Sequence, residues 1–374
     1  MIKDLFNNYI YPVVTLSASI IGAGFLSLPY ITLKVGIFTM LFYFAVLTAL
    51  VLFLHLIFGE ICLRTPDFKR WPGFVGFYLG KGAKKIILFS DNMGLLGILL
   101  AYLLIGSRFL TEILSPIFGG NNLNYALIYF IPAAVFVYFG VKLISRFDFF
   151  ALFFLLLILF LISIKGFSQI NLSNIFIQHL TPNTQYLFLP YGAIIFSLWG
   201  AGFIPEIEEM VRGNKRLLKK IITSSILLAA IFYLLFIFVI LGISGSQTTD
   251  SALTGLKNFL KPRIYSLALS IGVMTTFIAF ISTGLLLKKI LMYDLRVNKY
   301  SAWLLTCFLP LILLLSGFNL FIPLISLIGG VFLGIDGILI LLIYKKIGGK
   351  KLIAYPLMSV FILGIIYSIF YFSF

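Results

Sequence analysis

A seven-residue pattern occurs twice in the sequence, and its residue types can free backbone groups to bind a ligand. The copies read SIIGAGF from Ser19 and SLWGAGF from Ser197, and a proline follows each of them, at Pro29 and Pro205. Glycine weakens a helix and permits close approach of the backbone, and proline removes an amide donor. A helix that breaks here exposes N–H groups that attract an anion such as a carboxylate, and C=O groups that can hold a cation.

The alternative explanation of this pattern is close packing of helices through small residues. One copy alone favours packing. Two matching copies favour broken helices, because transporters place corresponding breaks around a binding site, where the freed backbone lines a cavity or is covered by protein. Trp199 within the second copy is interpreted as a pocket wall, with packing on a neighbouring helix as the alternative. The residues predicted to bind substrate at the breaks are Ser19, Gly22, Ala23, Gly24, Phe196, Ser197, Trp199, Gly200 and Gly202.

Two hydroxyls and two acids within or beside apolar stretches are the next candidates. Ser282 and Thr283 are adjacent, and Ala279 lies one turn earlier on a similar helical face. Taken alone, such hydroxyls are better explained as partners of carbonyls in their own helix. Asp336 lies in a long apolar run, where ionisable residues are costly and usually functional, so we expect a proton carrier, a gate partner or a charge pair. Glu206 follows the second break and either gates the site or pairs with nearby lysines.

Two simpler predictions concern other polar residues. Arg108 and Glu112 are four residues apart, which predicts a local ion pair on one helix face. Asp91 and Asn92 are predicted to cap the start of a helix.

The elements that carry these residues follow from composition. Hydrophobic residues make up 61% of the 374 residues and charged residues 11%, against about a quarter charged in a soluble domain. Apolar runs of about twenty residues, the length that crosses a hydrocarbon core of about 30 Å, recur along the chain, and the alternation of membrane β-strands is absent. The sequence therefore predicts an all-α polytopic membrane protein of about eleven transmembrane helices, with a short interfacial helix in the gap 63–85. The predicted transmembrane ranges are 11–31, 36–58, 86–113, 124–141, 149–164, 186–210, 220–243, 264–290, 301–317, 320–344 and 352–373.

The net charge of +16 is interpreted as a topology signal and not as a nucleic-acid signal. Sorting by the predicted helices places 22 of the 28 Lys and Arg residues on one side of the membrane. Because cytoplasmic loops collect basic residues, the N-terminus is predicted inside and, after eleven helices, the C-terminus outside, in a cell membrane. Contact with acidic lipids is the alternative role for the basic run 215–220. The first segment lacks a small-residue cleavage site, so it is predicted to be a retained helix and not a signal peptide.

The two glycine patterns define two halves of the chain. With the N-terminus inside, the first patterned segment enters from the inside and the sixth from the outside, so the two copies have opposite orientations. The sequence predicts a ten-helix core over 1–344, in which 1–165 and 186–344 are inverted five-helix repeats that each begin with a broken helix. Residues 345–374 are predicted to form an additional eleventh helix.

Three stretches of the sequence resemble a known family. They are GAGFLSLPY from Gly22, FSLWGAGFIPEIEEM from Phe196 and LGISGSQTTD from Leu241. The first closely resembles the helix 1 signature of the amino acid/auxin permease family, in the amino acid–polyamine–organocation superfamily, and the chain is also similar to the tyrosine/tryptophan permease branch. The resemblance implies the LeuT-type fold of two inverted repeats and symport of amino acids, although a fold alone does not assign a substrate.

The resemblance also implies roles for individual residues. Tyr102 matches a family tyrosine near the substrate, with a lipid-facing or core tyrosine as the alternative, whereas Trp199 stands where family members often have a smaller residue. In sodium-coupled members, an Ala-x-x-Ser/Thr-Ser/Thr pattern in helix 8 joins carbonyls of helix 1 around the ion, and such oxygen ligands suit a hard cation. The sodium ligands implied by this pattern are the hydroxyls of Ser282 and Thr283 and the carbonyls of Ala18, Ile21 and Ala279.

The coupling ion has two candidates. Proton-coupled relatives of this fold can place a lysine in the middle of the fifth helix. The predicted segment 149–164 contains no charged residue, and Lys165 lies at its end, which favours sodium. Similarity to the tyrosine/tryptophan branch favours the proton instead, with Asp336 and Glu206 as candidate carriers or gates.

Other classes of function lack the residues that they need. An intramembrane enzyme needs a nucleophile with a base, or a metal cluster, whereas His55 and His179 are isolated and have a structural interpretation. A channel needs a filter loop or a ring of charges, and carriers of metal ions or polyamines need more acids near the breaks.

The sequence therefore predicts a cation-coupled symporter of neutral amino acids, aromatic ones included. The alternative is a proton-coupled carrier of another small organic solute such as a polyamine. We expect no cofactor beyond Na⁺ or H⁺ as coupling ion. The expected partners are the amino acid substrate and the lipid bilayer, and not nucleic acid.

Overall fold

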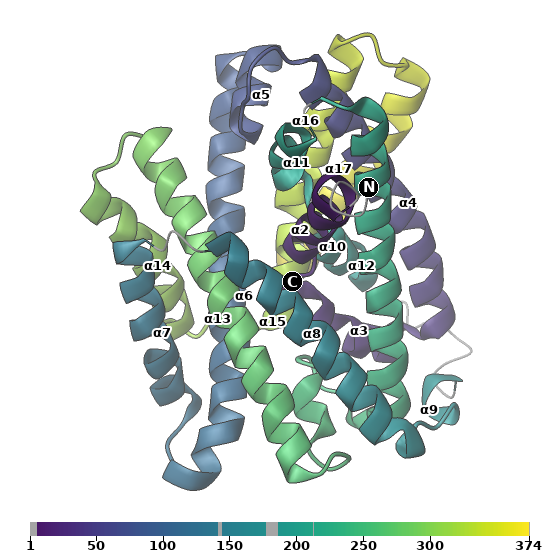
Figure 1. Cartoon of the computed structure of the whole chain (residues 1–374), viewed down its shortest axis with the longest axis vertical. Helices are drawn as coiled ribbons and strands as arrows, with labels where there is room; N and C mark the ends of the chain where they lie inside the picture. Colours follow the sequence, from purple (N-terminus) through teal and green to yellow (C-terminus); the bar gives the residue numbers. More distant parts are fainter. Residues whose placement is uncertain (1–5, 141–143, 177–185, 212, 374) are drawn as a thin grey trace.

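The computed structural model describes residues 6–140, 144–176, 186–211 and 213–373, and the regular elements in this part of the chain are all helices (Figure 1). The predicted all-α membrane architecture is thereby confirmed. The first half contains η1 (Phe6–Ile10), α2 (Tyr11–Ile20), η2 (Gly24–Ser27), α3 (Leu28–Val35), α4 (Ile37–Arg64), α5 (Trp71–Leu79), α6 (Lys81–Phe118), α7 (Asn122–Phe139), α8 (Ile144–Gly166) and α9 (Ser173–Phe176). The second half contains α10 (Leu189–Leu198), η5 (Ala201–Phe203), α11 (Ile204–Met210), α12 (Lys215–Ser244), α13 (Pro262–Tyr293), α14 (Lys299–Leu315), α15 (Phe321–Leu327), η8 (Ile328–Phe332), α16 (Leu333–Lys346) and α17 (Lys351–Ser373).

The described helices account for the predicted transmembrane segments. Seven are long and apolar enough to cross a membrane, and the pair formed by α2 and α3, bent by 53° at the first glycine pattern, makes an eighth. The other predicted segments correspond to α8, to the interrupted pair α10 and α11, and to α14. The short helix predicted in the gap 63–85 is α5, whose Trp71 and Phe74 are buried against the ring of Phe58 in α4.

Asparagine side chains start three of these helices. Each accepts a hydrogen bond from the backbone amide three residues later, which supplies a partner that the first helical turn lacks. The three N-caps and their distances are Asn121 of α7 at 3.1 Å, Asn214 of α12 at 3.0 Å and Asn298 of α14 at 2.9 Å.

The start of α6 differs from the prediction. The helix begins at Lys81, directly after Gly80, whose φ of 91° turns the chain sharply out of α5. Asp91 and Asn92 therefore lie in the third turn of α6, and the prediction that they cap a helix is wrong. The apolar run marked the part of the helix that lies in the hydrocarbon, and the helix extends well beyond that run.

Two groups of long helices surround the broken ones. In one group α13 packs against α6 and α8, and α7 and α14 pack against α6; in the other, α12 packs against α2 and α4. Figure 1 shows α2, α10 and α11 between these groups. We call the end of the molecule that holds α5 and the connection between α16 and α17 the basic end, and the end that holds the connection 245–261 the opposite end (Figure 1).

Candidate functional site

The first glycine pattern interrupts a helix, as predicted. The last residue of α2 is Ile20, and Ile21 leaves the helical conformation with ψ of 78°. The amide of Gly22 donates to the Ile20 carbonyl at 2.8 Å, whereas in a continuous helix it would donate to the Ala18 carbonyl. The break therefore releases the Ala18 carbonyl from its helical donor, and the amides that begin η2 have no preceding helical turn to accept from them.

The second pattern also interrupts a helix. Helix α10 ends at Leu198, Trp199 is extended with ψ of 123°, and η5 begins after Gly200. The freed amide of Gly200 donates to Nε2 of His55 at 2.9 Å, and Nδ1 of His55 lies 2.8 Å from the Val51 carbonyl. His55 of α4, which is completely buried, thus accepts the hydrogen bond of the backbone amide that the break has freed. The sequence indicated a structural histidine but not this partner, because the partner lies 145 residues away.

The two breaks pack directly against each other. A Cβ added to Gly24 would lie 2.6 Å from the ring of Phe196 and from Oγ of Ser197, and a Cβ added to Gly200 would lie 2.5 Å from Ile20. Oγ of Ser197 donates to the Ala193 carbonyl of its own helix at 2.7 Å. Gly24, Phe196 and Ser197 were predicted to bind substrate, but the structure places them in this helix contact and not on the cavity wall. The glycine pattern predicted where each helix breaks, but it did not predict which side of the break packs against the other helix.

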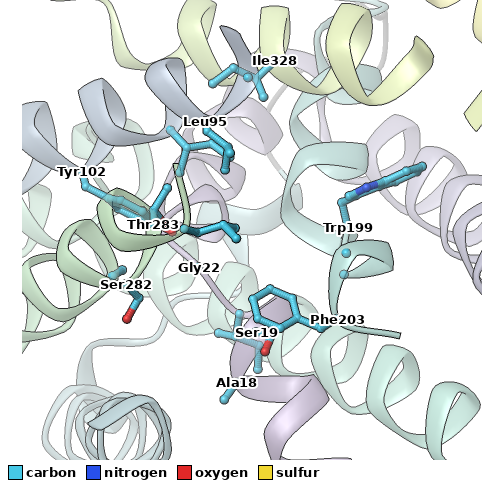
Figure 2. Close-up of a pocket in the computed structure, with 18 of the residues that line it drawn as sticks. Ala18, Ser19, Gly22, Leu95, Tyr102, Trp199, Phe203, Ser282, Thr283 and Ile328 are labelled. Atoms are coloured by element: carbon cyan, nitrogen blue, oxygen red, sulfur yellow. The ribbon is translucent and has the colours of Figure 1, made fainter. Parts of the chain in front are cut away.

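A cavity of about 660 Å³ lies beside both breaks. Figure 2 shows Gly22 in the middle of the view, with Tyr102 and Thr283 on one side and Trp199 on the other. The other predicted substrate residues that line it are Ser19, Ala23, Gly200 and Gly202. The predicted ion ligands Ala18, Ile21, Ala279, Ser282 and Thr283, and the acids Glu206 and Asp336, line the same cavity.

Part of the cavity wall is apolar and comes from helices that the sequence did not connect with the site. Leu95 and Ile98 of α6 line the cavity, as do Ile328 and Phe332 at the two ends of η8. Figure 2 shows Leu95 and Ile328 on the same side of it. The segment η8 is a π-helical turn, a local widening that is frequent at functional sites. A π-turn within a continuous apolar run leaves no pattern of residue types, so nothing in the sequence marked these side chains as part of the site.

The cavity reaches charged side chains at the basic end. Asp336 of α16 is buried, and one of its carboxylate oxygens accepts a hydrogen bond of 3.1 Å from the indole nitrogen of Trp71 in α5. Asp91 and Glu206 line the same region, together with Arg70, Lys289 and Asp294. Within the described parts of the chain, no ion pair joins these six side chains to one another or to other residues. His179 and the side chain of Lys165 lie outside the described residues.

The opposite end is closed by charges that do pair. Arg108 of α6 forms an ion pair with Asp250, and one turn away Glu112 accepts from Lys257 at 3.0 Å and from the hydroxyl of Tyr265 at 3.2 Å. The predicted pair between Arg108 and Glu112 is therefore wrong. Both side chains reach across to partners in and next to the connection 245–261, which helical spacing within α6 could not reveal.

The chain is similar to several characterised proteins. Residues 8–344 match the family model described as transmembrane amino acid transporter protein. A curated relative, glutamine transporter 2 of Aliivibrio fischeri, is 23% identical over 235 residues, which cover 61% of this chain and 59% of that protein, less than two thirds of its length.

Two solved structures share the fold. The structure of MhsT in complex with L-phenylalanine superposes with a TM-score of 0.71 at 14% identity, covering 97% of this chain and 98% of that one. The structure of Mhp1, a nucleobase-cation-symport-1 family transporter in a closed conformation with bromovinylhydantoin bound, gives a TM-score of 0.67 at 13% identity, covering 92% and 80%.

Proposed function

The chain belongs to the transmembrane amino acid transporter family, with a LeuT-type fold and no enzymatic role, and from this premise we propose that it is a secondary symporter of neutral, especially aromatic, amino acids coupled to sodium. The observation that carries the proposal is the cavity at the two broken helices, in which freed backbone groups and an apolar wall face the same space.

The break in helix 1 suits the charged groups of an amino acid. Amides at a helix start attract a carboxylate, and the hydroxyl of Tyr102 lies only 3.1 Å from where a Cβ on Gly22 would be. We propose that the substrate carboxylate binds between these amides and Tyr102. Carbonyls at the end of the preceding half-helix carry the negative end of its dipole, and they are proposed to receive the substrate amine.

The side-chain pocket favours an apolar substrate. Leu95, Ile98, Ile328 and Phe332 form one wall, Trp199 lies on another side, and the charged groups of the cavity gather toward the basic end. An aromatic side chain buries its full surface against such walls, whereas the amide of glutamine needs hydrogen-bond partners there. We therefore rank an aromatic amino acid above glutamine, the substrate in the name of the curated relative.

Sodium is the proposed coupling ion because residues that can supply hydroxyl and carbonyl oxygens line the cavity together with the last turn of α2. Ser282, Thr283 and the backbone of Ala279 line the cavity together with Ala18 and Ile21. The Ala18 carbonyl has lost its helical donor to the break, and a carbonyl without a donor is a natural ligand for a hard cation.

The proton is the second candidate for the coupling ion, and the burial of the Asp336 carboxylate favours it. This buried carboxylate lines the cavity, and its bond to Trp71 leaves it uncompensated by a basic side chain within the described residues. If protons drive transport, Asp336→Asn is expected to abolish uptake against a gradient while retaining exchange.

Uptake by proteoliposomes tests the proposal. A labelled mixture of neutral amino acids is offered while inward sodium and proton gradients are imposed separately, and competition by each unlabelled amino acid identifies the substrate. We expect uptake that follows the sodium gradient and is inhibited most strongly by aromatic amino acids. Uptake that ignores sodium and follows the proton gradient would overturn the choice of ion, and absence of amino acid uptake would overturn the function.

We also propose that the basic end faces the cytoplasm, which makes the described conformation open to the inside. A cysteine introduced at Asn319 is then expected to react with an impermeant reagent from outside, and one at Asn214 only after permeabilisation. Both positions are exposed. The reversed result would invert the proposed topology.

A further inference from the structure

A tyrosine hydroxyl lies at the junction of the two broken helices. The oxygen of Tyr233, in α12, is 2.7 Å from the carbonyl of Ser197 and 3.2 Å from the carbonyl of Ile20. These carbonyls belong to the last residue of α2 and the penultimate residue of α10. A single side-chain atom therefore meets the carboxyl ends of both half-helices.

Carbonyls that converge on one point from two helix ends attract a positive charge. Each end carries part of the negative helix dipole, and oxygen ligands of this kind hold hard cations. The Ile20 carbonyl also accepts from the amide of Gly22. Among the described residues it is therefore the buried carbonyl of Ser197 that would lose its donor without Tyr233, at a cost. In this chain the hydrogen of the Tyr233 hydroxyl supplies the positive charge, given mainly to Ser197 and shared with Ile20.

Aromatic rings fill the space around this hydroxyl. Tyr233 is completely buried, and its ring stacks on that of Phe25 with centroids 5.8 Å apart and planes at 7°. Phe232 and Phe236 pack edge-on against Phe25 at 5.4 and 4.7 Å. Phe25, Phe232 and Phe236 line the cavity, whereas Tyr233 is outside its lining. The rings thus lie between the junction and the cavity.

We propose that the Tyr233 hydroxyl takes the place of a cation between the two breaks, so that the junction binds no ion and each amino acid is coupled to one cation only. The inference rests on the proposed function, since it counts the ions of that transport cycle. It assigns Tyr233 as a positioning residue that holds α2 and α10 together at their broken ends.

Other contacts of α12 show why this hydroxyl can be removed without loss of the fold. Oγ of Ser225 donates to the Val13 carbonyl at 3.1 Å, and the hydroxyl of Tyr9 lies 2.7 Å from Oγ of Ser224. These bonds hold α2 and the preceding turn η1 on α12 independently of Tyr233. Among the described residues, the Tyr233 hydroxyl is the group of α12 that extends this hydrogen-bonded attachment to α10, so its loss is expected to weaken the coupling between the two breaks and to leave α2 in place.

The first experiment uses the unmodified protein and measures how many charges cross the membrane with each amino acid. Full-length protein in proteoliposomes is given a labelled mixture of neutral amino acids at a series of membrane potentials and ion gradients, and the reversal potential gives the net charge moved per amino acid. We expect one positive charge, whether sodium or the proton is the coupling ion. A value of two would overturn the inference while leaving symport itself intact, and absence of any uptake would instead overturn the proposed function.

The second experiment removes the hydroxyl alone. Tyr233→Phe keeps the ring, so we expect a maximal uptake rate lower by about tenfold, the scale of one lost buried hydrogen bond, and a half-saturating amino acid concentration changed by less than about threefold, because Tyr233 does not line the cavity. Tyr191→Phe is the matched control, since the Tyr191 hydroxyl in α10 is buried with no hydrogen-bond partner among the described residues. Equal maximal rates for both variants would overturn the positioning role of Tyr233.

Discussion

The two breaks share one pattern but use its glycines in opposite order. In the first break the leading glycine, Gly22, lies beside the Tyr102 hydroxyl in the cavity wall, and Gly24 packs against the other helix. In the second the leading glycine, Gly200, packs against Ile20, and a Cβ on Gly202 would meet no atom within 4 Å. The exchange of roles departs from two-fold symmetry, because copies related by an exact two-fold axis would place equivalent glycines in equivalent contacts. A repeated pattern thus locates two breaks, while their approach to each other decides which glycine is needed for packing and which for space.

The largest expected effects come from the packing glycines. Gly24→Ala and Gly200→Ala each place a Cβ about 2.5 Å from a neighbouring side chain in the helix contact, and overpacking of this kind lowers the free energy of unfolding by about 1–3 kcal/mol. Because the same contact sets the geometry of both breaks, we expect uptake to be lost as well. Thermal unfolding in detergent and uptake measure the two effects. Normal uptake by both variants would show that the breaks do not need this contact.

The cation site is expected to belong to the first break alone. Ser282→Ala or Thr283→Ala removes one oxygen ligand, at a cost of about 1–3 kcal/mol, so the sodium concentration for half-maximal uptake is expected to rise about five- to hundredfold. The double variant is expected to lose sodium dependence together with most transport. Uptake against sodium at fixed pH is the measurement, and an unchanged sodium curve in the double variant would remove these hydroxyls from the site.

The second break is expected to depend on His55 instead. His55→Phe leaves the buried amide of Gly200 without its acceptor, which lowers the free energy of unfolding by about 1–3 kcal/mol, with little change in the sodium dependence of the remaining uptake. His55→Gln is the matched variant, since its side-chain oxygen can accept from the same amide, and it is expected to recover part of the stability. Equal stability of the two variants would show that the histidine acts only by filling space.

The smallest effects are expected from the glycines that face the cavity. Gly22→Ala brings a methyl group within 3.1 Å of the Tyr102 hydroxyl, where the carboxylate is proposed to bind, so we expect the half-saturating amino acid concentration to rise by about three- to tenfold. Gly202→Ala has open space around it and is expected to change the same constant by less than about twofold. Both are expected to keep the parent's unfolding temperature. The opposite ranking in substrate affinity would place the substrate at the second break.

Residue patterns along the chain predicted the parts of this structure that depend on local sequence. The apolar runs gave the long helices, and the glycine–proline pattern gave both breaks. Pairing between distant segments left no such signal, so Asp250 as the partner of Arg108 and His55 as the partner of Gly200 were missed. Tyr233 was missed for the same reason. A tyrosine in an apolar run predicts a packing residue, and only the structure places two backbone carbonyls at its hydroxyl.

Because ion pairs join the helices at the opposite end, opening of that end is expected to become easier as ionic strength rises. The side chains of Arg108 and Asp250 are 32% and 34% exposed, so dissolved salt can screen their attraction, over a Debye length of about 10 Å at 0.1 M. A titration with sodium chloride therefore weakens these pairs while it fills a cation site, and the two effects add in the uptake rate. Replacing sodium with choline at constant total salt holds the screening fixed. The change in uptake with sodium concentration at constant total salt then measures binding of the ion alone.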